Sequence, residues 1–132
     1  MSRYFFLPLQ ILWAAPWTLL GLALGLLALA TGGGCQRVGR VWEFHGGVLA
    51  RLLQMVPIAG GAAAMTLGHV VIARTISCLD RSRRHELVHV AQYERWGLLF
   101  VPAYLSCSAW LWFRGYNAYL DNPFEEEAYR MG

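Results

Sequence analysis

The sequence predicts an α+β fold with an N-terminal apolar helix, a short β-sheet and two helices that carry polar site residues. The stretch from Tyr4 to Gln36 contains no charged residue, which favours an apolar helix. Two later runs, residues 38–45 and 69–76, are rich in β-branched and aromatic residues and therefore predict strands. The segments after residue 80 combine apolar spacing with capping residues, which predicts helices.

The chain of 132 residues has the length of one domain. We divide it into a hydrophobic membrane helix, residues 1–36, and a folded part, residues 37–132. The run from Leu9 to Ala30 is long enough to cross a bilayer, so we expect an uncleaved transmembrane or membrane-anchoring helix. A signal peptide and a buried helix of a soluble core are the alternatives. Gly21 and Gly25 form a small-residue face that predicts close packing on another helix, and through it a homo-oligomer.

The composition favours a membrane protein. Hydrophobic residues make up 57% of the chain and charged residues only 14%, against about 25% charged in soluble domains. The formal charge of +3 is scattered, with no basic stripe interleaved with aromatic residues, which excludes nucleic-acid binding. Arg37 and Arg40 follow the apolar run and Arg3 alone precedes it, so we expect the C-terminal part on the cytoplasmic side. The three cysteines lack metal-ligand spacing, which predicts reduced thiols.

Residues 85–89 read His-Glu-Leu-Val-His, a pattern typical of zinc sites. Side chains four residues apart lie on one face of a helix, so both imidazoles can point at one ion. Glu86 lies beside that axis, where it can take a proton from a zinc-bound water without ligating the metal. Asp80 or Ser82 can cap this helix and Gly97 can end it. The alternative is a buried helix whose histidines bond to backbone carbonyls.

A catalytic zinc site usually has three protein ligands, so His85 and His89 need a partner from elsewhere. The C-terminal run offers three glutamates on a helix that Asn122 can cap, with Pro123 in its first turn. One of these glutamates is expected to complete the site. The alternative role is structural, because glutamates in a first turn complement the helix dipole and Glu125 can fold back on the cap.

These motifs resemble the gluzincin metallopeptidases, above all the membrane-associated branch that contains the CAAX-processing and heat-shock zinc proteases. In that branch the third ligand is the first glutamate of a Glu-x-x-Ala-Asp motif on a later helix. Residues 125–129, Glu-Glu-Glu-Ala-Tyr, match this motif except that Tyr129 stands where the family has aspartate. The resemblance covers about residues 67–130. It implies one zinc ion with these ligands: His85, His89 and Glu125, with Glu127 as the fallback for the last.

The same resemblance implies a minimal zincin-like domain, with a short β-sheet, the HExxH helix and the C-terminal glutamate helix. The continuation to Gln92 is similar to small bacterial HExxHxxQ proteins, which implies a bacterial inner membrane. Three residues are further candidates for supporting the metal ligands or the transition state: Gln92, Tyr129 and His69. A strand near the active-site helix is expected to pair with extended substrate, a general mode of peptide recognition. This substrate strand is His69, Val70, Val71, Ile72 and Ala73, and the alternative is a core strand without substrate.

The remaining segments carry weaker signals. Val48 to Val56 predicts either a short helix or a strand, and Pro57 to Gly61 predicts a turn. The apolar segment 98–113 is shorter than a full span and predicts a buried or interfacial helix.

Together the motifs and the resemblance imply a membrane-associated zinc metallopeptidase that hydrolyses a peptide or protein substrate and contacts membrane lipid. The alternative is a non-catalytic, zinc-binding membrane scaffold or interaction protein with the same fold. The two differ in the metal site, because a catalytic zinc keeps an open coordination position and a structural zinc is closed by four protein ligands.

Overall fold

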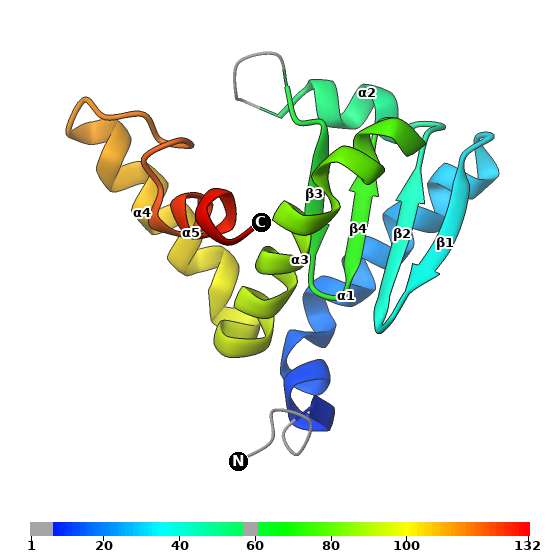
Figure 1. The fold of residues 1–132 in the computed structure, drawn as a ribbon, viewed down its shortest axis with the longest axis horizontal. Coiled ribbons are helices and arrows are strands. Elements are labelled where there is room, and N and C mark those ends of the chain that lie inside the picture. The colour runs from blue at the N-terminus through cyan, green and yellow to red at the C-terminus, as the bar shows by residue number, and fades with distance from the viewer. Residues whose placement is uncertain (1–6, 57–60) are drawn as a thin grey trace.

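The computed structural model describes residues 7–56 and 61–132, and it confirms the predicted mixed α+β fold (Figure 1). The elements follow in the order α1 (Leu7–Ala30), β1 (Gly34–Val38), β2 (Val41–His45), α2 (Leu49–Gln54), β3 (Ala64–Leu67), β4 (Val70–Ala73), α3 (Ile76–Trp96), the short 3₁₀ helix η1 (Gly97–Leu99), α4 (Phe100–Phe113) and α5 (Pro123–Met131). Residues 1–6 of the predicted N-terminal segment and residues 57–60 of the predicted turn lie outside the described ranges.

Four strands form one mixed sheet in the order β1-β2-β4-β3. The central strands β2 and β4 are parallel, whereas β1–β2 and β3–β4 are antiparallel pairs. Each antiparallel pair is a tight hairpin whose turn contains a glycine with positive φ, Gly39 at +59° or Gly68 at +62°, a conformation that glycine adopts without strain. The outer edges of the sheet therefore belong to β1 and β3.

The observed strands differ from the predicted ones. The predicted strand 38–45 comprises the last residue of β1, a hairpin turn and β2, because Gly39 interrupts the run. Residues 48–56, for which a short helix and a strand were both open, contain helix α2. The predicted strand 69–76 contains β4, followed by the start of α3. Strand β3 lies in a stretch without a strand signal in the sequence.

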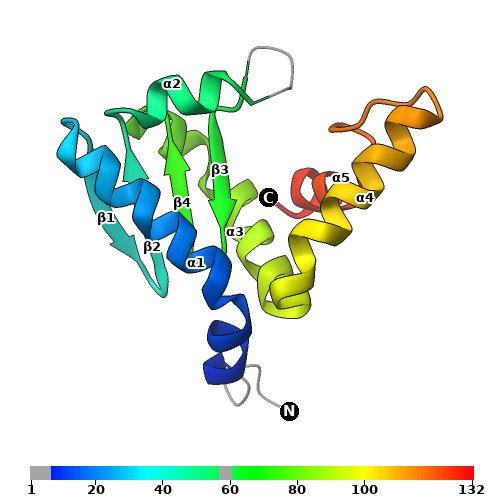
Figure 2. The same ribbon diagram turned by 180° about the vertical axis from the view of Figure 1, so that it is seen from behind.

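Helix α1 lies across one face of the sheet and contacts all four strands (Figure 2). A Cβ atom at Gly21 would lie 2.7 Å from the Val70 Cβ, and one at Gly25 would lie 2.6 Å from the Phe44 ring. The small-residue face, which we expected to pack on another helix, thus packs α1 on its own sheet. Because β1 begins at Gly34, the predicted division at residue 36 falls within a strand.

Helix α3 covers the opposite face of the sheet (Figure 1). It begins at Thr75, whose hydroxyl accepts a hydrogen bond from the Cys78 amide at 3.1 Å. The predicted caps Asp80 and Ser82 are wrong, because both lie inside the helix. The predicted end is confirmed: Gly97 has a φ of +57° and its amide bonds to the last turn of α3.

Helix α4 projects away from the sheet, and α5 folds back to pack against α3 (Figure 1). The predicted start of α5 is confirmed. The Asn122 Oδ1 accepts a hydrogen bond from the Phe124 amide at 2.9 Å, and Pro123 occupies the first turn. This return places the glutamates of α5 beside one face of α3.

Two segments are long and apolar enough to cross a membrane, judged by length and composition: Leu9–Ala30 and Ile76–Phe113. The second combines α3, η1 and α4, and its uncharged part is η1 with α4. Core helices and signal sequences share these properties, so the finding is compatible with membrane association without assigning a compartment.

Candidate metal centre

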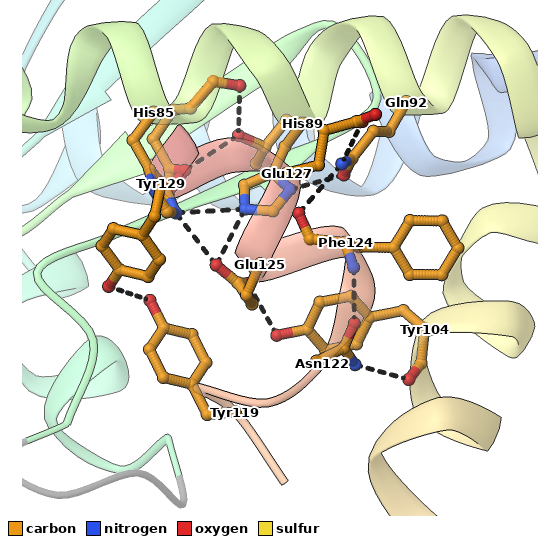
Figure 3. A network of polar contacts seen from close by, with 12 residues as sticks. His85, His89, Gln92, Tyr104, Tyr119, Asn122, Phe124, Glu125, Glu127 and Tyr129 are labelled. Atoms are coloured by element: carbon orange, nitrogen blue, oxygen red, sulfur yellow. Dashed lines mark hydrogen bonds and ion pairs between the residues drawn. The ribbon is translucent and has the colours of Figure 1, made fainter. Parts of the chain in front are cut away.

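Three ligand atoms from α3 and α5 lie together (Figure 3). The Glu125 Oε1 lies 2.9 Å from the His85 Nε2 and 3.1 Å from the His89 Nε2, and the two nitrogens are 3.3 Å apart. Within residues 7–56 and 61–132, no fourth histidine, cysteine, aspartate or glutamate joins this group. The structure therefore forms a possible metal-binding triad from His85, His89 and Glu125, without Glu127.

The spacing of the three atoms fits a small divalent ion. A tetrahedral zinc ion with ligands at about 2.0–2.1 Å has neighbouring ligand atoms about 3.3 Å apart. The observed separations of 2.9, 3.1 and 3.3 Å need only small side-chain adjustments to reach this value. Two imidazoles and a carboxylate are also ligands that zinc commonly takes. The donor set thus fits one zinc ion, to which it would supply three of four ligands.

Gln92 fixes the orientation of His89. The Gln92 Oε1 lies 2.7 Å from the His89 Nδ1, so Nδ1 carries a proton and Nε2 is the nitrogen that could bind a metal once it has lost its own proton. The Gln92 Nε2 donates to the Phe124 carbonyl at 2.9 Å and to the Glu127 Oε1 at 2.8 Å, which sets the orientation of the amide. Gln92 is fully buried and bonds to residues of both helices, so it joins His89 of α3 to α5.

Glu125 is held from two sides. The Tyr104 hydroxyl donates to its Oε2 at 2.7 Å, while its Oε1 faces the histidines. Burial alone would raise the pKa of Glu125, but hydrogen bonds from His85 and His89 outweigh burial and lower this pKa to about 2. Burial likewise would lower the pKa of His89, but the bond with Glu125 and nearby negative charge raise it to about 9. A metal that bound here would have to displace that proton, so its binding would strengthen as the pH rises.

The start of α5 is fixed by Asn122, which is fully buried. Besides capping α5, its Nδ2 donates to the Tyr104 carbonyl at 3.1 Å and to the Ser108 hydroxyl at 2.9 Å. One side chain therefore joins α4 to α5 and holds both Tyr104 and Glu125 in place.

Glu86 is buried on the side of α3 that faces the sheet. In the described part of the chain its carboxylate has one hydrogen-bond partner, the Thr66 hydroxyl of β3, at 3.3 Å. Burial raises the pKa of Glu86, and the charges of His89 and His85 offset this rise only in part. The carboxylate thus lies within electrostatic reach of the triad and has the raised proton affinity of a general base.

Other buried glutamates outside the triad have basic partners. Glu43 of β2 accepts two hydrogen bonds from Arg83, at 2.9 and 3.0 Å. Glu94 of α3 bonds to Arg40 and to the His69 Nε2 at 2.9 Å. Burial alone would raise the pKa of Glu94, but these partners lower it to about 2.

The predicted substrate strand, residues 69–73, is wrong. Strand β4 pairs with β2 on one side and with β3 on the other, so its backbone groups already have partners. His69 lies in the turn before β4 and contacts Glu94, and no hydrogen bond within the described residues joins it to the triad. The outer edge beside α3 belongs to β3, which carries Thr66.

The other predicted site residues lie around the triad. Glu127, the fallback ligand, bonds to Gln92 and to the Arg95 Nη2 at 2.6 Å. Tyr129 lies against His85 with 4.3 Å between ring centroids, and its hydroxyl is 3.0 Å from that of Tyr119 (Figure 3). Tyr129 therefore lies against His85, at the position where the gluzincin motif that this segment resembles has an aspartate.

Sequence reasoning missed Tyr104 and Thr66. Tyr104 lies in a segment whose only sequence signal is apolar composition, and Thr66 lies in a strand without a signal. The cap formed by Asn122 was visible in the sequence, but its bonds to α4 depend on the tertiary fold.

Comparison with protein-family models, curated proteins and solved structures finds no match to this chain.

Proposed function

We propose that the protein is a membrane-associated zinc metallopeptidase with a zincin-like fold. In this proposal His85, His89 and Glu125 hold one zinc ion, and Glu86 is the general base for hydrolysis of a peptide bond. The convergence of the three ligand atoms supports the metal site, and the resemblance of the two motifs to gluzincins supports the reaction.

The environment of Glu86 supports its proposed role as the general base. Burying a carboxylate without a basic partner destabilises a fold, and the protein pairs Glu43 and Glu94 with arginines. Among the residues that the structure describes, the Glu86 carboxylate instead has a threonine hydroxyl as its one hydrogen-bond partner, and it lies beside the triad. Carboxylates in such environments are typical of catalytic sites, where a raised pKa suits proton transfer.

A bound zinc ion would lower the pKa of a coordinated water to about 7 and polarise the substrate carbonyl. Glu86 would accept a proton from the attacking water and pass it to the leaving amine. Gln92 keeps His89 in the tautomer that can ligate, and Tyr104 restrains Glu125. An extended peptide can pair with the outer edge of β3, where Thr66 contacts Glu86.

The test compares three glutamine variants in zinc content per protein and in hydrolysis of fluorescently labelled casein and a quenched peptide library. Glu86→Gln should keep its zinc and lose roughly 10²–10⁴-fold in rate, the usual contribution of general acid–base catalysis. Glu125→Gln should lose zinc. Glu126→Gln is the matched control, because Glu126 is the exposed neighbour in the same helix. Full hydrolysis by Glu86→Gln with its zinc intact would overturn the mechanism, and equal zinc in wild type and His89→Ala would overturn the metal site.

A further inference from the structure

The outer face of α1 is apolar along the helix. Leu12, Leu19 and Leu26 recur at seven-residue steps and are 69%, 65% and 64% exposed. The indole nitrogens of Trp13 and Trp17 have acceptors within the protein: they donate to the carbonyls of Glu94 in α3 and Leu98 in η1, at 3.0 and 3.2 Å. The exposed face thus resembles a hydrocarbon surface.

Helix α4 forms a second exposed apolar surface. It contains no charged residue, and four large side chains stand out: Leu105, Trp110, Trp112 and Phe113 are 58–81% exposed. Figure 2 shows α1 in front of the sheet and α4 in front of α5, so both helices lie on the same broad side of the molecule. Figure 1 shows α3 and α5, which carry the triad, on the other side.

The packing of α1 argues against a transmembrane position. The helix contacts all four strands, so a bilayer crossed by α1 would also have to contain the sheet. The open edges of the sheet expose backbone groups, which hydrocarbon cannot satisfy. The opposite face also carries the ion pair between the buried Glu43 and the partly exposed Arg83.

Two exposed tryptophans pair with arginines at the borders of these surfaces. The Arg37 guanidinium lies 5.5 Å from the Trp42 ring, and that of Arg114 lies 4.4 Å from the Trp110 ring. Trp42 is on the α1 side of the sheet, because it shares the strand face of Phe44, which packs on α1. Tryptophan prefers the membrane interface, and basic side chains there meet lipid phosphates.

We infer that the protein is monotopic: α1 and α4 lie in the plane of an anionic phospholipid bilayer, with the leucines of α1 among the acyl chains. The two tryptophan–arginine pairs lie at headgroup level. A second copy of this chain explains the arginines less well, because each stacks over an exposed tryptophan at the edge of the apolar surface rather than opposite an acidic group.

Topology is tested by cell-free synthesis of the full chain in the presence of preformed phosphatidylglycerol vesicles. In a background in which Cys35, Cys78 and Cys107 are alanine, Ser2→Cys and Glu126→Cys report the two ends, and Arg51→Cys, at an exposed position of α2, reports the part between the two apolar segments. A membrane-impermeant maleimide should label all three cysteines fully before detergent is added. Protection of any one of them until detergent is added would show that an apolar helix crosses the bilayer, and would overturn the inference.

The binding face is tested by vesicle flotation. Leu19→Glu/Leu26→Glu should weaken binding about 10²-fold, from the lost burial of two leucines. The matched control Ile76→Glu/Met131→Glu introduces the same charges at exposed apolar positions of α3 and α5, and should bind as wild type does. Equal weakening in both variants would overturn the assignment of the face.

The arginines provide a second, milder test that does not disturb apolar packing. Arg37→Gln/Arg114→Gln should lose roughly 30-fold in binding to phosphatidylglycerol vesicles, about fivefold per arginine, and nothing in phosphatidylcholine vesicles. The control Arg84→Gln/Arg130→Gln removes the same charge from exposed positions of α3 and α5, and should show no loss. A wild-type protein that forms a lipid-free soluble dimer and does not float would instead assign the apolar face to a second copy.

Discussion

Replacing Gln92 by leucine probes the metal centre without touching a ligand. Leucine fills similar volume but removes three hydrogen bonds, to the His89 Nδ1 at 2.7 Å, to the Glu127 Oε1 at 2.8 Å and to the Phe124 carbonyl at 2.9 Å. The buried His89 Nδ1–H then lacks an acceptor, and nothing holds the ring in the tautomer that presents Nε2 to a metal.

The expected effects are measurable in both stability and affinity. An unsatisfied buried donor costs about 1–3 kcal/mol. Loss of a hydrogen-bond partner behind a metal-ligating histidine typically weakens metal binding by about 10–100-fold. We therefore expect the Gln92→Leu protein to unfold more easily without metal, and to bind zinc about 10–100-fold more weakly than wild type.

Zinc affinity is measured by competition with a chromogenic chelator, and the stability of the metal-free protein by urea denaturation in excess EDTA. The control is Glu127→Gln, which keeps an oxygen acceptor for Gln92 and should change zinc affinity by less than about threefold. An unchanged zinc affinity in folded Gln92→Leu would refute the positioning role. A loss in Glu127→Gln as large as that in Glu125→Gln would make Glu127 a ligand.

Two further predictions concern the fold. Gly25→Leu should lower the free energy of unfolding by at least about 1–3 kcal/mol, because even a Cβ there would lie 2.6 Å from the buried Phe44 ring; Leu26→Ala on the exposed face is the control, and equal melting temperatures would contradict the packing. The pKa of Glu94 is lowered to about 2 in the folded state. The ionised carboxylate therefore stabilises the fold above the unfolded pKa of about 4, and this stabilisation is lost as the pH falls from about 4 towards 2. Wild type should therefore lose more stability than Glu94→Gln between about pH 5 and pH 2, as followed by urea denaturation; parallel pH profiles would exclude the ion pair.

The parts of the site that follow from local signals were predictable from the sequence. The histidine spacing, the end of α3 at Gly97 and the capped start of α5 at Asn122 each depend on a few neighbouring residues. Placing Glu125 beside His85 needed one more step, the return of the chain through α4, which the resemblance to gluzincins supplied.

The strands were harder to predict, because their pairing depends on residues distant in sequence. Residues 69–76 are rich in β-branched residues throughout, yet only Val70–Ala73 is a strand, since Thr75 caps a helix. Strand β3 is held by its pairing with β4 and by contacts with α3, neither of which leaves a local signal. The same reason hides Thr66 as the partner of Glu86.

The N-terminal helix shows why hydropathy alone misjudges this chain. An apolar run suggests a helix separate from the domain that follows, but α1 contacts the end of α3. The Trp13 indole donates to the Glu94 carbonyl. This is one of the last carbonyls of α3, which have no partner within the helix. Ala14 also packs in one cluster with Tyr93, whose hydroxyl donates to the Thr66 carbonyl on β3. The packing that holds α1 therefore extends to the strand edge beside Glu86, so α1 and the candidate site form one folded unit. A membrane surface that receives α1 consequently fixes the orientation of the sheet and of the metal centre as well.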